Sequence, residues 1–482
     1  MGTAAHAQAP RRRVACRVGR SGVVVLALLL AMLAPATTMA ATQYWFPGKG
    51  WGHGIGMSQY GAQGFAGRGF TAEQVIRYYF NGVSVDDAAG NPTFRVLLVE
   101  GRSELEVVAR GGNVTVTRNG ASSSDVDAGD VLRIRRGGAG TCVLRIRDGA
   151  TSTLLGCGAG TVVVTGAVAT RFTADNGAFG HRYRGHLRFV PHGAGLRAVN
   201  HVPLELYLRG VVPSEMPASW HAEALGAQAI AARSYALATR RSGPFDAFAD
   251  TRSQVYRGIE HEHSRTTAAV NATRGLIATV GGQVVPTFYH STSGGRTANI
   301  EHVWNSEPRS YLRGRPDPWE RSPHSSWDIR EVRFGPAHIR RQLGAASAPG
   351  AIRDIRVQVN GSGRVQQARI VTARGTRTIP GTQVREALGL RSTFFRVERL
   401  EIRARARQVR RGQRVAIEGT VPRSGATFLV FRPRSGGRWQ RVGRVRPQRG
   451  TRYRVNVRPQ QDGVYRLQRR GQLGPGVRIR VR

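Results

Sequence analysis

The stretch 201–241, HVPLELYLRGVVPSEMPASWHAEALGAQAIAARSYALATRR, joins a short apolar run to a long helical pattern through a proline-bounded turn. Tyr207–Val212 is rich in apolar, β-prone residues and predicts a short strand. Pro213 and Pro217 interrupt regular structure on either side of Glu215. The pattern therefore predicts that a single glutamate is held on a turn between a strand and a helix.

The helix is expected to begin after Ser219, a residue type that favours the N-cap position. Arg233 lies on a face of this helix that otherwise has few large side chains. An acid with apolar neighbours and a nearby arginine has the surroundings that shift a pKa, so Glu215 is the candidate catalytic acid. The alternative is a solvated turn residue, because most glutamates are exposed. The spacing that predicts the helix comes from Leu225, Ala229, Ala232 and Ala236 on one face and Gly226, Ile230 and Arg233 on another.

The chain has 482 residues, enough for two or three domains, and a formal net charge of +42. Nearly all the basic residues are arginines, and Lys49 is the only lysine. This charge favours a polyanionic partner such as the anionic polymers of a cell wall, or else reflects a bias toward arginine over the whole surface. We expect no nucleic-acid partner, because no strand shows the basic-aromatic pattern of a stacking platform.

Residues 1–40 have the layout of a secretory signal peptide. Five arginines precede the apolar run Val23–Leu33, and Thr38-Met39-Ala40 offers a small-residue cleavage site. We expect a secreted or cell-wall protein outside the cytoplasmic membrane. The alternative is retention by an uncleaved N-terminal anchor.

Two of the three cysteines are placed symmetrically about a turn. Cys142 and Cys157 flank residues 148–151, so they would face each other in a hairpin of that register. We predict a disulfide between them, which is stable outside the cell. Cys16 lies in the expected signal peptide, and two cysteines without a nearby histidine make a poor zinc site.

Two further segments present polar side chains from glycine-rich sequence. Residues 51–62, WGHGIGMSQYGA, are followed by a helical pattern at 71–80, and residues 286–296, PTFYHSTSGGR, place a β-prone run before a loop. Glycines permit positive φ and close backbone approach, so both segments are suited to present side chains to a ligand. The candidate ligand-binding residues are His53, Ser58, Gln59 and Tyr60 in the first segment and Tyr289, His290, Ser291 and Ser293 in the second.

The run from Leu204 to Tyr235 resembles the central motif of the stage II sporulation protein D / amidase-enhancer family (SpoIID/LytB domain), whose members act on bacterial peptidoglycan. The resemblance covers roughly 44–83 and 183–397, and it implies that Tyr289, His290, Ser291 and Ser293 form part of a substrate groove. Residues 51–62 resemble a family motif that usually follows the central one, whereas here they precede it, as if the chain were permuted. Some relatives bind zinc through cysteines around 248–253. This chain has Phe248 and Ser253 there, so we expect no metal and no cofactor.

The expected fold class is α+β. Residues 41–400 would form a mixed catalytic domain in which 92–180 are a β-rich insertion. Residues 401–482 predict a small β-sandwich-like domain, and their 23 arginines and three acids give a net charge of +20. This basic domain would bind anionic wall polymers, unless its charge is only surface bias.

These expectations together favour a lytic transglycosylase that cleaves the glycan strands of peptidoglycan. Glu215 would protonate the glycosidic oxygen and then accept a proton from the C6 hydroxyl. Arg233 would position substrate or shape the pKa of Glu215. The alternative is a non-catalytic wall-binding protein that enhances a separate cell-wall amidase.

Overall fold

The computed structural model describes residues 40–87, 90–109, 112–119, 123–138, 140–147, 149, 151–166, 170–173, 181–323, 332–423, 425–448 and 450–482. Residues 1–39 of the expected signal peptide, Cys16 among them, lie outside these residues. The chain divides into two compact units, one over Tyr44–Arg399 and the other over Leu400–Arg482 together with residues 40–43. Within the described ranges, no helix has the length and apolar character needed to cross a membrane.

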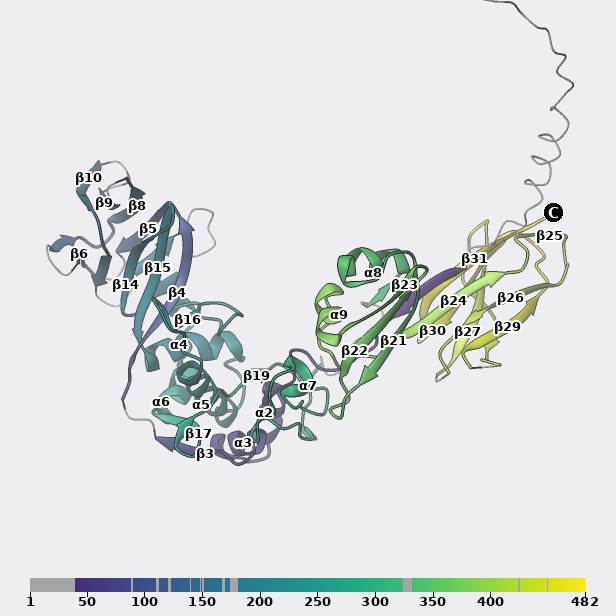
Figure 1. The fold of residues 1–482 in the computed structure, drawn as a ribbon, viewed down its shortest axis with the longest axis horizontal. Coiled ribbons are helices and arrows are strands. Elements are labelled where there is room, and N and C mark those ends of the chain that lie inside the picture. Colours follow the sequence, from purple (N-terminus) through teal and green to yellow (C-terminus); the bar gives the residue numbers. More distant parts are fainter. Residues whose placement is uncertain are drawn as a thin grey trace, which may run out of the picture. The chain divides into compact units, whose positions relative to one another are not determined.

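A group of helices forms the centre of the larger unit (Figure 1). Ala-rich α5 is buried on nearly all sides and contacts α2, α3, α4 and α6. The helices are α2 (Gln59–Ala66), α3 (Ala72–Tyr79), α4 (Leu204–Glu215), α5 (Ala222–Ala238), α6 (Ser264–Ala272) and α7 (Glu301–Trp304), with a 3-10 turn at Ile259–His261. Short strands β2 (Met57–Ser58), β3 (Ser84–Asp87), β17 (Leu276–Val280), β18 (Gln283–Val284) and β19 (Tyr289–His290) lie among them.

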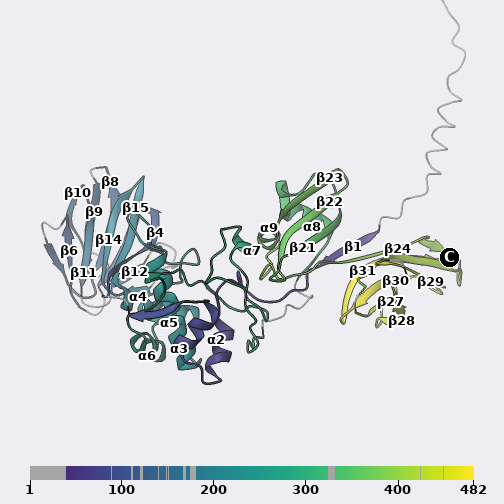
Figure 2. The same cartoon turned by 60° about the horizontal axis from the view of Figure 1, so that its bottom comes forward.

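Two larger sheets share one apolar core with α4 and α5 (Figure 2). The first runs β16 (Ala247–Phe248), β4 (Thr93–Arg102), β15 (Gly195–Pro203), β14 (His186–His192), β11 (Val162–Gly166), β6 (Val114–Arg118) and β7 (Ser123–Val126). The second runs β10 (Thr151–Gly158), β9 (Gly140–Arg147), β8 (Val131–Gly137), β5 (Glu104–Ala109), β12 (Thr170–Thr173) and β13 (His181–Tyr183). Because β15 leads directly into α4, the sheets fix the start of the helix that carries Glu215.

The end of the larger unit is a small α/β layer with its own core. Its sheet has the order β21 (Ile352–Val359), β22 (Val365–Thr372), β23 (Gly375–Pro380), packed with α8 (Pro336–Leu343), a 3-10 turn at Gly344–Ala346 and α9 (Gly381–Ala387). Nearby, Tyr44 and Trp45 of β1 (Ala41–Trp45) pair with β20 (Arg333–Phe334).

The smaller unit is built from antiparallel strands with one parallel pair. One set of neighbours is β24 (Glu398–Ala404), β26 (Val415–Thr420) and β29 (Arg452–Val457). The other is β25 (Gln408–Val409), β31 (Gln472–Val481), β30 (Gly463–Arg469), β27 (Thr427–Pro433) and β28 (Gln440–Val445), where β25 runs parallel to β31. The mixed α+β class that the sequence predicts is therefore confirmed.

The predicted strand at Tyr207–Val212 is wrong, because this segment lies within helix α4. Its buried apolar residues recur at helical spacing, namely Leu204, Tyr207, Leu208, Val211 and Val212. Ser219 is not the cap of the next helix either. The N-cap is His221, whose ring accepts a hydrogen bond from the backbone N–H of Glu223 at 3.3 Å.

The disulfide that the sequence predicts is present. Strands β9 and β10 form an antiparallel hairpin in which Cys142 and Cys157 are direct partners, and their sulfur atoms are bonded. The pairing lies in the β-rich region, away from the helices that hold Glu215.

Candidate active site

Glu215 is the last residue of α4 and is half-buried. Its Oε1 accepts a hydrogen bond of 2.9 Å from the backbone N–H of Val255, and the Tyr289 side chain also bonds to the carboxylate. Two groups from different parts of the chain therefore hold the carboxyl in one position.

Burial is the largest influence on this carboxyl and raises the pKa of Glu215 above its ordinary value. The Val255 N–H, Tyr289 and the positive charge of Arg257 oppose this shift, because each stabilises the carboxylate. A carboxyl with a raised pKa retains its proton at higher pH than an ordinary glutamate, which suits a proton donor.

Tyr289 is held by a chain of hydrogen bonds that runs through the core. Tyr207 donates to Oε1 of Gln254 at 3.3 Å, and Nε2 of Gln254 donates to the Tyr289 hydroxyl at 3.0 Å. Since the Tyr289 oxygen accepts from Gln254, its own proton is directed to Glu215. This candidate residue therefore lies beside the acid, and its role in a substrate groove stays a prediction.

The glycine-rich segment 51–62 lies directly against the other two motif segments. Strand β2 pairs in parallel with β19, and the Tyr60 N–H donates to the Ser291 carbonyl at 3.1 Å. Nε2 of Gln59 donates to the Glu215 backbone carbonyl at 3.0 Å and to Gln228 at 3.3 Å. Gln59 thus supports the end of α4, and its amide nitrogen already donates hydrogen bonds to groups of the protein.

The two candidate histidines are bonded to backbone groups. Nε2 of His53 donates to the Tyr289 carbonyl at 2.9 Å while Nδ1 accepts from the Ile55 N–H at 3.0 Å, and His290 bonds the Ile55 carbonyl at 3.2 Å. Burial lowers the pKa of His53 to about 3 and lowers that of His290 well below its ordinary value. Both rings are therefore neutral at pH 7, and they fasten the two motif segments to each other.

Ser58 and Ser293 do not face a ligand, because both side chains are fully buried. Ser58 caps α2 by accepting from the Gly61 N–H at 3.1 Å and donates to Glu320 at 3.2 Å. The Ser293 hydroxyl oxygen lies within hydrogen-bonding distance of both acids, 2.9 Å from Asp317 Oδ2 and 2.6 Å from Glu320 Oε2. The expectation that these serines bind substrate is therefore corrected: they hold the buried Asp317 and the half-buried Glu320.

Asp317 and Glu320 were not predicted from the sequence. Asp317 also accepts a hydrogen bond of 2.8 Å from Tyr79, and burial together with the charge of Glu320 raises the pKa of Asp317 to about 6. Both acids lie in a proline-containing loop, where the sequence has no helical or strand periodicity that could indicate which side chains are buried.

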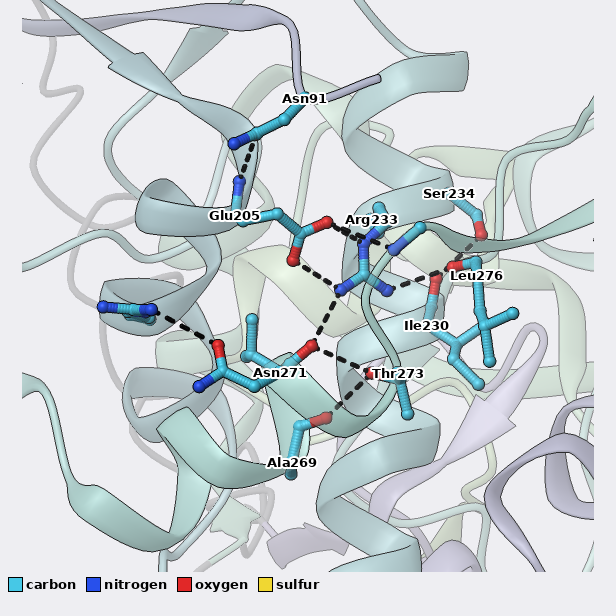
Figure 3. Close-up of polar contacts among 12 residues, drawn as sticks. Asn91, Glu205, Ile230, Arg233, Ser234, Ala269, Asn271, Thr273 and Leu276 are labelled. Carbon is cyan, nitrogen blue, oxygen red and sulfur yellow. Dashed lines mark hydrogen bonds and ion pairs between the residues drawn. The ribbon is translucent and has the colours of Figure 1, made fainter. Parts of the chain in front are cut away.

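Arg233 is in the core, where it lies against Glu205 (Figure 3). Its guanidinium pairs with both carboxylate oxygens of Glu205 at 2.7 and 2.8 Å and donates to the carbonyls of Leu276 and Val270. With 1% of its surface exposed, it cannot reach a glycan. The predicted role of Arg233 in binding substrate or tuning Glu215 is therefore wrong, because Glu205 of α4 covers the helix face that looked bare.

The arginine that acts on Glu215 is Arg257, which the sequence did not indicate. Arg257 is exposed and makes no ion pair with the residues that the structure describes. An exposed cation beside a half-buried acid is suited to hold a polar substrate close to the proton donor.

The histidines near residue 260 serve local structure. His263 caps α6 by accepting from the Arg265 N–H at 3.2 Å, and the His261 ring packs edge-on against His181. Among the described residues, no three His, Cys, Asp or Glu side chains are grouped as metal ligands.

The site is typical of a class of protein in which a long buried helix, here α5, and a glycine-rich segment, here residues 51–62, surround one half-buried acid, here Glu215. Residues 192–279, which contain α4, Glu215 and α5, match the sequence model of the family described as SpoIID, Stage II sporulation protein. This part of the chain is therefore a domain of the stage II sporulation protein D family, which confirms the resemblance.

Relatives with known sequences agree with this assignment. Stage II sporulation protein D of Bacillus subtilis is 30% identical over 226 residues, 42% of this chain and 62% of the relative. The amidase enhancer of Bacillus subtilis is 37% identical over 122 residues, 25% of this chain and 16% of the relative. An uncharacterised protein of Brachyspira hyodysenteriae is 40% identical over 129 residues, 26% of this chain and 35% of the relative. The chain thus spans less than two thirds of each of these relatives.

Proposed function

We propose that this protein cleaves the glycan strands of peptidoglycan as a lytic transglycosylase, with Glu215 as the only acid and base. The observation that carries the proposal is the half-buried Glu215 carboxyl, fixed by Val255 and Tyr289 and raised in pKa by burial. The likeness to stage II sporulation protein D and to an amidase enhancer supports a substrate in the cell wall.

One carboxyl is sufficient for this reaction. Protonated Glu215 gives its proton to the glycosidic oxygen as the bond from C1 breaks, and the resulting carboxylate takes the proton of the C6 hydroxyl as that oxygen bonds to C1. The product is a 1,6-anhydro sugar, no water is consumed, and Glu215 ends protonated. Hydrolysis, in contrast, generally uses two carboxyls about 5–10 Å apart. The charged group that shifts the pKa of Glu215 is Arg257 and not a second carboxylate.

The test is mass spectrometry of purified glycan strands after incubation with the protein. We expect anhydro-ended fragments with the wild type and none with Glu215→Gln, which keeps the size of the side chain but has no proton to give. Arg252→Gln, on the same loop but paired with Asp250, is the control and should retain activity. Fragments with reducing ends would show hydrolysis and contradict the proposal.

A second candidate function is non-catalytic enhancement of a cell-wall amidase, favoured by the likeness to the amidase enhancer. In that case the site binds glycan without cutting it. Strand binding without any cleavage, combined with faster peptide release when a purified amidase is added, would support this function over the first.

We also propose that the protein works outside the cytoplasmic membrane. The Cys142–Cys157 disulfide supports this location, because such bonds persist in oxidising compartments. A substrate in the wall requires the same location, and the basic residues 401–482 would add attraction to anionic wall polymers.

A further inference from the structure

A cavity of about 540 Å³ lies between α7 and the small α/β layer at the end of the larger unit. Its volume is within the ~300–1,000 Å³ that small-molecule sites occupy. His53, the α7 residues 301–304, strand β22, strand β23 and helix α9 contribute to its walls. The sequence did not indicate this cavity, since its walls come from five separate segments.

The walls are fixed by hydrogen bonds between the helix and the layer. The Ser362 hydroxyl bonds His302 at 3.0 Å and the Asn299 N–H at 3.2 Å, and Asn360 donates to the His302 carbonyl at 3.0 Å. The Gly52 N–H donates to the Arg391 carbonyl at 2.9 Å. The cavity is therefore a formed feature of the fold.

Arg385 of α9 brings to this cavity a positive charge that has no ion-pair partner among the described residues. Its Nε is buried without a partner, and its guanidinium makes no hydrogen bond or ion pair with any residue in the described ranges. Glu301, another lining residue, accepts hydrogen bonds at Oε1 from Asn299 and Arg313, at 2.9 and 2.8 Å, and its Oε2 is buried without a partner among the described residues. Burial lowers the pKa of Arg385 and the charge of Glu386 raises it, so a ligand anion would supply a partner that the protein does not.

The rest of the lining suits a sugar. Trp304 is 43% exposed, and its ring is held edge-on by Phe288 at 4.7 Å, so the indole provides a rigid apolar surface for sugar C–H groups. Side chains that can form hydrogen bonds also line the cavity, contributed by His302, Gln366, Gln367, Thr378 and Thr382. Arginine binds carboxylate in a planar, two-bond geometry. The neighbouring charge of Glu386 would oppose a phosphate dianion more strongly than a carboxylate.

We propose that this cavity binds a sugar residue that carries a carboxylate, with Arg385 on the carboxylate and Trp304 against the ring. The ligand class rests on the proposed function, in which the substrate is a glycan strand with carboxylate-bearing sugars. His53 connects the two places, because it lines the cavity and bonds the carbonyl of Tyr289, whose hydroxyl bonds Glu215.

The test is calorimetric binding in the Glu215→Gln background, where cleavage plays no part. The probes are a peptidoglycan tetrasaccharide with free lactyl carboxylates, the same tetrasaccharide with those carboxyls amide-bonded to peptides, and a neutral N-acetylglucosamine tetrasaccharide. We expect Arg385→Gln to weaken the first probe at least ten-fold and to leave the neutral one unchanged, and Trp304→Ala to weaken both. Arg353→Gln, an exposed change of the same charge on β21, is the matched control and should bind as the parent does.

Equal affinity of the Arg385→Gln and Arg353→Gln proteins for the first probe would overturn the proposal. So would preference for the peptide-bearing probe, because the recognised carboxylate would then belong to a peptide. The cleavage assay with wild type is separate: binding that depends on Arg385 without cleavage would leave this site standing and reject the lytic activity.

Discussion

Replacement of Arg233 by methionine should destabilise the larger unit strongly. The side chains of Arg233 and Glu205 are 1% and 6% exposed and are joined by two contacts of 2.7 and 2.8 Å. Methionine fills similar space but leaves the Glu205 carboxylate buried without its cation, which costs about 3–5 kcal/mol in comparable buried pairs. Loss of the bonds to Leu276 and Val270 adds to this, because they join α5 to β17 and α6.

Urea unfolding followed by tryptophan fluorescence measures this effect, since six of the seven tryptophans fall between residues 44 and 399. Arg77→Met is the control: its pair with Glu73 is exposed, at 52% and 42%, and should contribute only about 0.3–0.5 kcal/mol. The double variant Glu205→Leu/Arg233→Met removes both charges and should recover much of the lost stability.

A loss of less than about 1 kcal/mol in Arg233→Met, together with loss of glycan binding, would refute this reasoning. It would mean that Arg233 reaches the substrate, as the sequence alone had indicated. A large loss of stability with unchanged binding per folded molecule would establish Arg233 as a core residue.

Three further predictions concern charge. If Glu215 is the acid, the cleavage rate should fall as pH rises through its pKa, and Arg257→Gln should move this decline to higher pH, because a positive charge that lowers the pKa is removed; an unmoved pH–rate profile would contradict the role of Arg257. Asp317 has an ordinary pKa of 3.8 and a folded pKa of about 6, so its contribution to stability is greatest below pH 4 and is lost as pH rises through 6. Urea titrations at pH 4 and pH 7 should show that the free energy of unfolding changes less with pH in Asp317→Asn than in the wild type. The same change with pH in both proteins would contradict this role of Asp317. Deletion of residues 401–482 should reduce sedimentation with whole cell walls at 0.1 M salt but much less at 1 M, where the Debye length is only about 3 Å; equal binding with and without this region at every salt concentration would show that its charge is surface bias.

Local patterns predicted several elements well. The helix expected at 71–80 is α3, whose N-cap Thr71 and residue Gln74 form a capping box, and the alanine-rich helix after the proline turn is α5. The region expected to be β-rich, 92–180, contains strands such as β4 and β6. These predictions succeeded because the signals are carried by residues close together in the chain.

The failures depend on long-range packing. Tyr207–Val212 has strand-forming residues, yet tertiary burial of the Leu204, Leu208 and Val211 face selects a helix. Arg233 was placed correctly on α5, but sequence periodicity does not reveal that Glu205 covers that face. Arg257 and Asp317 lie in irregular segments. The sequence of such a segment has no periodicity that would indicate which side chains point toward the site.

The order of the motifs along the chain matters less than the backbone contacts between them. At Gly54, with φ of +84°, a Cβ would lie 2.2 Å from the Arg364 guanidinium, and at Gly56, with φ of +69°, it would lie 2.2 Å from the Phe288 carbonyl. Residues 51–62 therefore approach their partners through bare backbone, which specifies the contact by shape and by the β2–β19 pairing. Such a contact forms whether the segment precedes or follows α4 in the sequence. Because Gln59 in this segment then bonds the Glu215 carbonyl, the candidate acid is positioned by a motif about 150 residues earlier in the chain.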